Sequence, residues 1–274
     1  MKLAIISDIH ANFQALKAVF ADIETKNVDK IICLGDIIGK GVNARKCIDL
    51  VKKKCDVILR GNTDDRFSQN ADNFKNNIEE YKRIKYNQSL LNDDDFLFLS
   101  NLPLCYEIKL SGNLIRFFHA HPTSPYKTIN NYNMDFNEKY KLFLPTENTA
   151  SQEIADFVVF GHLHYQFMEK IYNRTIVNSG SVGCQGCLIF DEELNAKAKE
   201  IRQAHYIIID GTESEEEIGN LSIPFQSVSY DIEREFEDND ENPEKDSYYD
   251  ELFNAKYRGI SKAMENLKNA GYKF

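Results

Sequence analysis

Five of the six histidines in this sequence lie in three short motifs, and each motif follows an apolar run. The motifs are Asp8-Ile9-His10, His119-Ala120-His121 and His162-Leu163-His164. Residues two apart on an extended chain share a face, so each motif presents two polar side chains in the same direction. Imidazole and carboxylate groups are ligands of divalent transition metals. The three motifs together therefore indicate a metal site, whereas a single such histidine would be interpreted as a polar core residue.

Two further polar residues end apolar runs: Asp36 follows Gly35, and Asn62 follows Gly61. Glycine permits a sharp turn and a close approach of a ligand to the backbone. α/β sheets build their sites from residues at several strand ends. The two acids, the amide and the histidines are more donors than one ion needs. We therefore predict two divalent transition-metal ions that share one carboxylate, with manganese expected and iron, zinc, nickel or cobalt as alternatives.

The elements that position these residues alternate in type over the first hundred residues. The sequence predicts strands at 3–7, 31–36 and 56–62, with helices at 12–24 and at 43–53. Strands separated by helices imply parallel neighbours joined by crossovers. The first half of the chain is therefore expected to form a largely parallel sheet.

From about Pro103 onward the predicted strands follow one another with short links and no helix between most of them. They are 105–110, 114–119, 156–160, 166–171, 174–178 and 205–210. This pattern favours a second, more antiparallel sheet that includes all six strands. Two sheets packed face to face with helices outside would accommodate the whole order.

The acidic residues are concentrated near the C-terminus. Residues 211–251 hold 15 Asp and Glu against 2 Lys and Arg, out of a net charge of −10 for the chain. We expect a catalytic domain at 1–210, and at 211–274 an acidic segment and an amphipathic helix (252–270) packed on or extending that domain. Because 211–251 contains no predicted ligand, neutralising its charges from Glu233 to Glu251 is expected to leave turnover nearly unchanged.

Composition also limits the compartment and the partners. No stretch reaches the ~20 apolar residues of a membrane helix, and the N-terminus MKLAIISDIH is typical of a first strand rather than a signal peptide. The six scattered cysteines are expected to be reduced thiols, so we predict a cytoplasmic protein without membrane partners. The sequence contains no dense stripe of Lys and Arg, so a nucleic acid polymer is not expected as a partner. Homo-oligomerisation is left open.

Six sequence blocks occur in a familiar order: SDIHAN, CLGDIIGKG, GNTDD, FFHAHP, VVFGHLH and VNSGSVG. This series, which spans about residues 1–183, resembles that of calcineurin-like metallophosphoesterases. It is most similar to the compact bacterial and archaeal branch of phosphodiesterases and phosphatases. The resemblance implies an α/β fold, a four-layer αββα sandwich of two mixed β-sheets flanked by helices.

The resemblance also implies a ligand set for each ion. One metal would be held by Asp8, His10, Asp36 and His164. The second would be held by Asp36, Asn62, His119 and His162, so that Asp36 bridges the two. A hydroxide between the metals would attack phosphorus in line while the metals hold the phosphate oxygens. Asn62 would also donate to a phosphoryl oxygen or orient the nucleophile.

Several positions depart from the family pattern. Many relatives carry a histidine acid where this chain has Thr63. Asp64 matches the acid that orients that histidine, and its other interpretation is a cap of the following helix. His121 replaces a small hydroxyl residue and would be a substitute proton donor, a metal-edge ligand or a pocket wall. Lys40 would reach an anionic substrate or be a solvated loop lysine. Cys184 and Cys187 would be ordinary thiols or an accessory metal or redox pair.

The sequence therefore predicts a dinuclear phosphodiesterase or phosphomonoesterase acting on a small phosphate ester such as a nucleotide. A protein phosphatase is disfavoured, because the loop IIGKG after Asp36 lacks the arginine of relatives that act on phosphoproteins. The alternative from another class is a non-catalytic scaffold of the same fold that binds protein partners, as the related retromer subunit does. Such scaffolds tend to lose metal ligands, whereas here every ligand position is filled.

Overall fold

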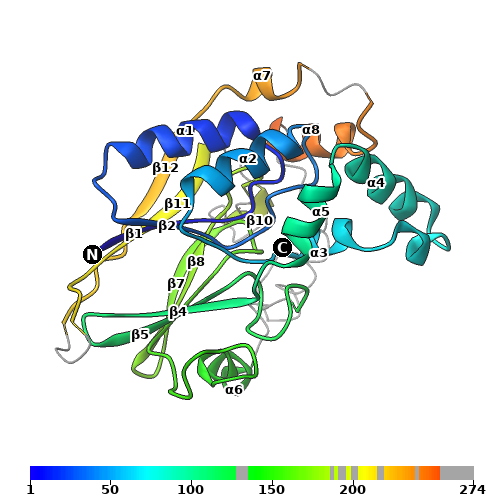
Figure 1. Cartoon of the computed structure of the whole chain (residues 1–274). Helices are drawn as coiled ribbons and strands as arrows, with labels where there is room; N and C mark the ends of the chain where they lie inside the picture. The colour runs from blue at the N-terminus through cyan, green and yellow to red at the C-terminus, as the bar shows by residue number, and fades with distance from the viewer. Residues whose placement is uncertain are drawn as a thin grey trace.

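The computed structural model describes residues 1–127, 135–185, 188–190, 196–198, 203–214, 219–237 and 241–253. Two five-stranded sheets stack face to face, with α1 and α2 on the outer side of one and α6 on the outer side of the other (Figure 1). Among the helices described, none combines the length and the apolar character that crossing a bilayer requires.

The first sheet contains three parallel strands extended by an antiparallel pair. Its order is β12 (Phe225–Ser229), β11 (Gln203–Asp210), β1 (Lys2–Ile6), β2 (Lys30–Cys33) and β3 (Val57–Ile58). The helices α1 (Phe13–Glu24) and α2 (Ala44–Lys54) connect the parallel strands β1, β2 and β3. Asn12 caps α1 by accepting a hydrogen bond from the N–H of Ala15, and the apolar positions of α1 face the sheet.

The second sheet is also mixed. Its order is β4 (Cys105–Leu110), β5 (Asn113–Phe118), β6 (Phe157–Phe160), β8 (Arg174–Ser179) and β7 (Gln166–Ile171). The central strands β5, β6 and β8 are parallel, and the hairpins β4–β5 and β7–β8 form the two edges. Because parallel strands run the same way, the carboxyl ends of β5 and β6 lie at the same edge of this sheet.

The remaining elements surround these sheets. They are α3 (Asn62–Ser68), η1 (Ala71–Phe74), α4 (Ile78–Ser89), α5 (Asp93–Ser100), α6 (Phe136–Tyr140), η2 (Lys141–Phe143), β9 (Leu188–Phe190), β10 (Ala196–Ala198), α7 (Ile232–Glu235) and α8 (Lys245–Phe253). The strands β9 and β10 form a separate two-stranded sheet.

Alternation along β1 shows why the layers form. Leu3 and Ile5 belong to the core between the two sheets, whereas Ala4 and Ile6 belong to the core beneath the helices. A third apolar cluster, which includes Phe143, covers the outer face of the second sheet. A strand buried on both faces is a continuous apolar run, as LAII is. The fold-class prediction, an αββα sandwich, is confirmed.

Most predicted elements are confirmed within one to three residues, and strands 105–110 and 166–171 have the predicted bounds. The placement of 205–210 in the second sheet is wrong, because β11 pairs antiparallel with β1 in the first sheet. Ile207 and Ile209 of β11 face the core between the sheets, while Tyr206 faces the helices. An apolar strand of this kind satisfies either sheet, and its sequence does not specify its neighbour.

The chain after residue 210 packs on the same body. β12 joins the first sheet, and α8 packs through Tyr248 and Leu252 against Ile232 of α7. The domain division after residue 210 stays a prediction. The predicted helix at 252–270 overlaps α8 only at residues 252–253, and the rest of it lies outside the described residues.

Candidate metal centre

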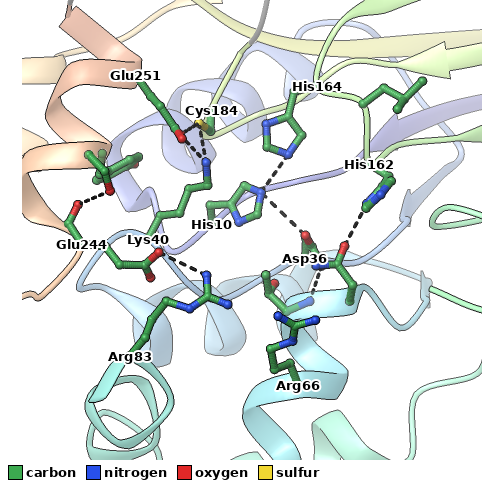
Figure 2. A pocket seen from close by; sticks show the side chains of 15 residues that line it. His10, Asp36, Lys40, Arg66, Arg83, His162, His164, Cys184, Glu244 and Glu251 are labelled. Atoms are coloured by element: carbon green, nitrogen blue, oxygen red, sulfur yellow. Dashed lines mark hydrogen bonds and ion pairs between the residues drawn. The ribbon is translucent and has the colours of Figure 1, made fainter. Parts of the chain in front are cut away.

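The predicted ligands come from the ends of five strands. Figure 2 shows four of them, His10, Asp36, His162 and His164, pointing toward one another. From the first sheet, Asp8 and His10 follow β1, Asp36 follows β2 and Asn62 follows β3. From the second sheet, His119 follows β5, while His162 and His164 follow β6. The structure therefore brings all seven predicted metal ligands together.

Five of these ligands adopt backbone conformations that residues other than glycine rarely take. Their φ angles are 54° for Asp8, 52° for His10, 53° for Asp36, 64° for His162 and 64° for His164. Such left-handed residues are uncommon outside glycine and gather at functional sites, where surrounding contacts maintain the strain. Here hydrogen bonds between neighbouring turns maintain these conformations. The backbone N–H of His10, in the turn after β1, donates to the carbonyl of Asp36, in the turn after β2, over 2.9 Å.

Gly161 allows the two sheets to meet at the site. A Cβ at this position would lie 2.0 Å from Oγ of Ser7 and 2.4 Å from Oδ2 of Asp8. The absence of a side chain lets the N–H of His162 reach Oδ2 of Asp8 over 2.8 Å. The turn after β6 is thereby fixed directly to the turn after β1.

Asp8, His10 and His164 form the first donor group. Nε2 of His10 lies 3.0 Å from Nε2 of His164, which in turn lies 3.2 Å from Oδ1 of Asp8. Oδ1 of Asp8 is buried and accepts no hydrogen bond of good geometry from any described residue. Their donor atoms all lie within 4.8 Å of one another. The lone pairs of these ring nitrogens and of this carboxylate oxygen point to one place, and a cation bound there would be a common partner for them.

Asp36, Asn62, His119 and His162 form the second donor group. Oδ1 of Asn62 lies 3.0 Å from Nε2 of His119 and 2.9 Å from Nδ1 of His162. The other nitrogen of His119, Nδ1, lies 3.2 Å from the carbonyl oxygen of Leu34. A backbone carbonyl at this distance favours the tautomer that leaves Nε2 free to bind a metal.

The carboxylate of Asp36 faces both groups. Its Oδ2 lies 3.7 Å from Nε2 of His10, and its Oδ1 lies 3.5 Å from Nε2 of His119. Asp8, His10, Asp36 and His119 are almost completely buried. The donor set therefore fits two cations that share Asp36.

Burial and neighbouring charge set the protonation of these ligands. Burial lowers the pKa of His10, and it lowers the pKa of His162 to about 3, so both rings are neutral and able to bind metal. Burial also opposes a charged His164, but the Asp8 carboxylate and, to a lesser extent, Cys184 together outweigh it and raise that pKa to about 10. A cation between Asp8 and His164 would replace the proton that the pair otherwise holds.

Asp64 is buried and binds the backbone around Asp36. Its carboxylate oxygens accept hydrogen bonds from the backbone N–H groups of Asp36 (2.7 Å), Ile37 (2.9 Å) and Gly61 (3.0 Å), and the last of these caps α3. Burial and the nearby Asp36 charge raise the pKa of Asp64 to about 7. The contacts of Asp64 are those of a residue that positions the Asp36 loop.

Thr63 lines a cavity beside these ligands, described below, but supplies no titratable group. Its hydroxyl donates to the carbonyl of Ile38 over 2.8 Å, and its N–H donates to Oδ1 of Asp36 over 2.8 Å. His121, in contrast, is not among the residues that line the cavity. Its ring nitrogens lie 2.9 Å from Oγ1 of Thr123 and 3.2 Å from Nζ of Lys127. A proton-donor role for His121 has no support in this arrangement.

A cavity of about 370 Å³ opens beside the ligands. Five predicted ligands line it: His10, Asp36, Asn62, His162 and His164. The other lining residues are Lys40, Thr63, Arg66, Arg83, Leu163, Cys184, Glu244, Ser247, Tyr248 and Glu251. Residues of the acidic segment therefore form part of the wall, although none of them is a predicted ligand. The expectation that neutralising the charges from Glu233 to Glu251 leaves turnover nearly unchanged stays a prediction. The interpretation of Lys40 as a solvated loop residue is wrong, because Lys40 pairs with Glu251 inside the cavity.

The sequence contains one signal for this wall. Tyr248 and Leu252 are four residues apart and flank Glu251 within the acidic segment, a spacing typical of a helix packed on a core. Arg66 and Arg83 have no comparable local signal. Cys184 contacts Lys40 and Glu251, which gives its thiol a place in the wall, whereas Cys187 lies outside the described residues.

Comparisons with known proteins match the part of the chain that carries these residues. The profile of the calcineurin-like phosphoesterase superfamily domain matches residues 1–192. An uncharacterised protein of Methanocaldococcus jannaschii is 27% identical over 240 residues, which cover 86% of this chain and 90% of the relative.

Two crystal structures share the fold. A metallophosphoesterase from Sphaerobacter thermophilus is 20% identical with a TM-score of 0.63, and the match covers 98% of this chain and 100% of that one. A hypothetical protein from Pyrococcus horikoshii OT3 is 17% identical with a TM-score of 0.68, and the match covers 94% of this chain and 98% of that one. With more than half of its length matched by the domain profile, this chain belongs to the calcineurin-like phosphoesterase superfamily.

Proposed function

We propose that this protein is a dinuclear metal-dependent phosphoesterase that hydrolyses a phosphodiester or phosphomonoester of a small molecule, such as a nucleotide. The observation that carries this proposal is the position of Asp36, whose two oxygens face His10 on one side and His119 on the other. Bound divalent cations would supply Lewis acidity and a lowered pKa for water, which is the chemistry that phosphoryl transfer requires.

The residues of the chain have distinct tasks in this proposal. Asp8, His10, Asp36 and His164 would hold one ion, and Asp36, Asn62, His119 and His162 would hold the other. Asn62 turns its Oδ1 toward His119 and His162, so its amide group is the candidate donor to a phosphoryl oxygen. Asp64 would keep the Asp36 loop in place during the reaction.

The cavity supports a small substrate, because about 370 Å³ lies at the lower end of the range for small-molecule sites. Manganese is the proposed ion, since mixed carboxylate, amide and imidazole donors suit it. We also place the protein in the cytoplasm. The five described cysteines, at positions 33, 47, 55, 105 and 184, are free thiols, as a reducing compartment maintains them.

Metal analysis and turnover test the proposal together. Protein reconstituted with Mn²⁺ should hold two ions per chain and hydrolyse aryl phosphate monoesters or diesters, and a chelator should abolish both properties. Asp36→Asn should reduce the bound metal and turnover more than any other single ligand change, because it weakens both ions. The neighbouring Asp65→Asn is the control, since Asp65 contacts Arg60 and Tyr126 rather than the ligands. A stoichiometry of one ion in the native protein would overturn the dinuclear site.

A further inference from the structure

The segment 241–253, which contains α8, lies beyond the family profile match and forms one wall of the cavity. It is anchored, because Tyr248 and Leu252 are buried and the Tyr248 hydroxyl lies 3.4 Å from the carbonyl of Gly183. The side chain of Asn242 also donates to the carbonyl of Lys40. Glu244 and Glu251 therefore occupy fixed positions at the site, as Figure 2 shows.

Each cation that lines the cavity, among the described residues, contacts a carboxylate. Glu251 accepts from Lys40 and, over 2.8 Å, from the thiol of Cys184. Glu244 lies 3.2 Å from Nη1 of Arg83. Arg83 and Arg66 also share Glu80, at 3.0 and 2.9 Å. The three cations Lys40, Arg66 and Arg83 are thus matched by the three carboxylates Glu80, Glu244 and Glu251.

Such pairs determine what can enter beside the metal ligands. A second phosphate or carboxylate on a substrate would need a cation, and each cation here already has a buried or half-buried carboxylate partner. Separating a pair would leave Glu251 or Glu244, which are 4% and 7% exposed, without its counter-charge in a place of low dielectric. An uncharged hydroxyl or amide, in contrast, can hydrogen-bond to the edge of an ion pair without separating it.

We propose that Glu244 and Glu251 make the cavity selective for phosphate esters whose alcohol half is polar but uncharged, and that they reject esters with a second anionic group there. This inference rests on the proposed phosphoesterase function and adds the substrate class to it. Rejection follows from the pairing itself, since each of the three cations on the wall already pairs with a carboxylate: Lys40 with Glu251, Arg83 with Glu244 and Arg66 with Glu80, which does not itself line the cavity.

Two phosphonates of the same shape test this selectivity by calorimetry on the Mn²⁺-loaded protein. They are para-carbamoylphenylphosphonate and para-carboxyphenylphosphonate, which differ only in the charge of the distal group and are not hydrolysed. The native protein should bind the carbamoyl compound at least about tenfold more tightly. In Glu251→Gln and in Glu244→Gln this ratio should fall to about one or invert, because Lys40 then loses its carboxylate and Arg83 keeps only the Glu80 that it shares with Arg66. Asp246→Asn, an exposed change of equal charge on α8, should keep the native ratio.

The outcomes separate the two proposals. A native ratio near one, a ratio unchanged in both glutamine variants, or no binding of either phosphonate would overturn the selectivity. The metal content of each variant is measured beside binding, so that loss of an ion is recognised. If the protein hydrolyses aryl phosphates but binds the two phosphonates equally tightly, the selectivity is refuted and the phosphoesterase function stands. If the protein binds the carbamoyl phosphonate more tightly as expected but hydrolyses no phosphate ester, the phosphoesterase function is refuted and the selectivity is not.

Discussion

The backbone N–H of Asp36 donates a hydrogen bond of 2.7 Å to Oδ2 of Asp64, a carboxylate that is completely buried behind the metal site. The other oxygen of Asp64 accepts a hydrogen bond from the backbone N–H of Ile37, the residue after Asp36. The left-handed conformation of Asp36, with φ of 53°, is held in this way. The position of Asp36, the proposed shared ligand, therefore depends on a side chain that does not line the cavity.

Asp64→Asn should consequently weaken metal binding without removing a ligand. An amide has one acceptor oxygen in place of two, so at least one of the hydrogen bonds to the Asp36 loop is lost. We expect Mn²⁺ affinity to fall about 10–100-fold, as for other groups that orient metal ligands. Titration of the apo protein with Mn²⁺ measures it. Asp65→Asn is the control, and equal affinities in the two variants would contradict the positioning role.

Turnover should depend steeply on the leaving group, because Thr63 provides no general acid. Its hydroxyl donates to the carbonyl of Ile38 and does not titrate usefully. A general acid contributes about 10²–10⁴ in rate, chiefly when the leaving alkoxide is basic. Rates on a series of aryl phosphodiesters should therefore fall sharply as the leaving-group pKa rises. Thr63→His should flatten the series and help the poorest leaving groups most.

His121→Ala is the control for that series. Since the contacts of His121 are with Thr123 and Lys127, its removal should leave the slope unchanged. A shallow slope in the native enzyme would show that another group supplies the proton. A slope that steepens on removal of His121 would identify that group as His121.

The stability of the protein should decrease between about pH 4.5 and 7 because of Glu235. Burial raises the pKa of this carboxyl from 4.5 to about 7, although the N–H of Gln14 donates to it. A folded-state pKa above the unfolded one means that the stabilisation is complete below pH 4.5 and is lost as pH rises through 7. At ~1.4 kcal/mol per unit, the loss amounts to about 3 kcal/mol at pH 8.

Glu235→Gln removes this titration while preserving shape. The unfolding free energy of the variant minus that of the native protein should rise by about 3 kcal/mol from pH 4.5 to pH 8. Urea unfolding of both proteins at the two pH values measures this difference. Glu233→Gln changes an exposed residue of the same helix and should show no such trend. A difference between Glu235→Gln and native protein that is independent of pH would refute the assignment.

Arg116 is the largest completely buried side chain described, and it organises the outer face of the second sheet. It pairs with Glu107 at 2.7 Å and donates to the carbonyls of Phe143, Leu144 and Glu153. Arg116→Met leaves the buried Glu107 without a counter-charge and should cost about 3–5 kcal/mol of unfolding free energy.

The double variant Arg116→Met with Glu107→Gln tests that explanation. It should lose less than the sum of the two single changes, because the unpaired charge is then absent. Denaturant unfolding of all three variants gives the coupling. A cost below about 1 kcal/mol for Arg116→Met would show that the pair contributes no more than a surface ion pair.

The convergence of the candidate ligands could be predicted from the sequence because each of them is part of a local pattern. A strand buried on both faces is a short apolar run, and the polar residue that ends it must lie at an edge of a sheet. Asp8, Asp36 and Asn62 each follow such a run, and His119 and His162 do so in the second sheet. The order of strands and helices indicated two sheets for the same reason, although it did not specify that β11 pairs with β1.

Packing between distant segments decided the rest. Glu251 pairs with Lys40 across 211 positions of the sequence, and His162 bonds to Asp8 across 154. Neither contact has a local pattern, because the backbone N–H of His162 meets Asp8 only after the two sheets have packed, and Glu251 meets Lys40 only after α8 has packed on them. The left-handed conformations of the ligands run against local preference and persist through contacts between turns. The sequence alone thus determined which residues could bind metal, whereas the tertiary structure determined which charged residues line the cavity and how they pair.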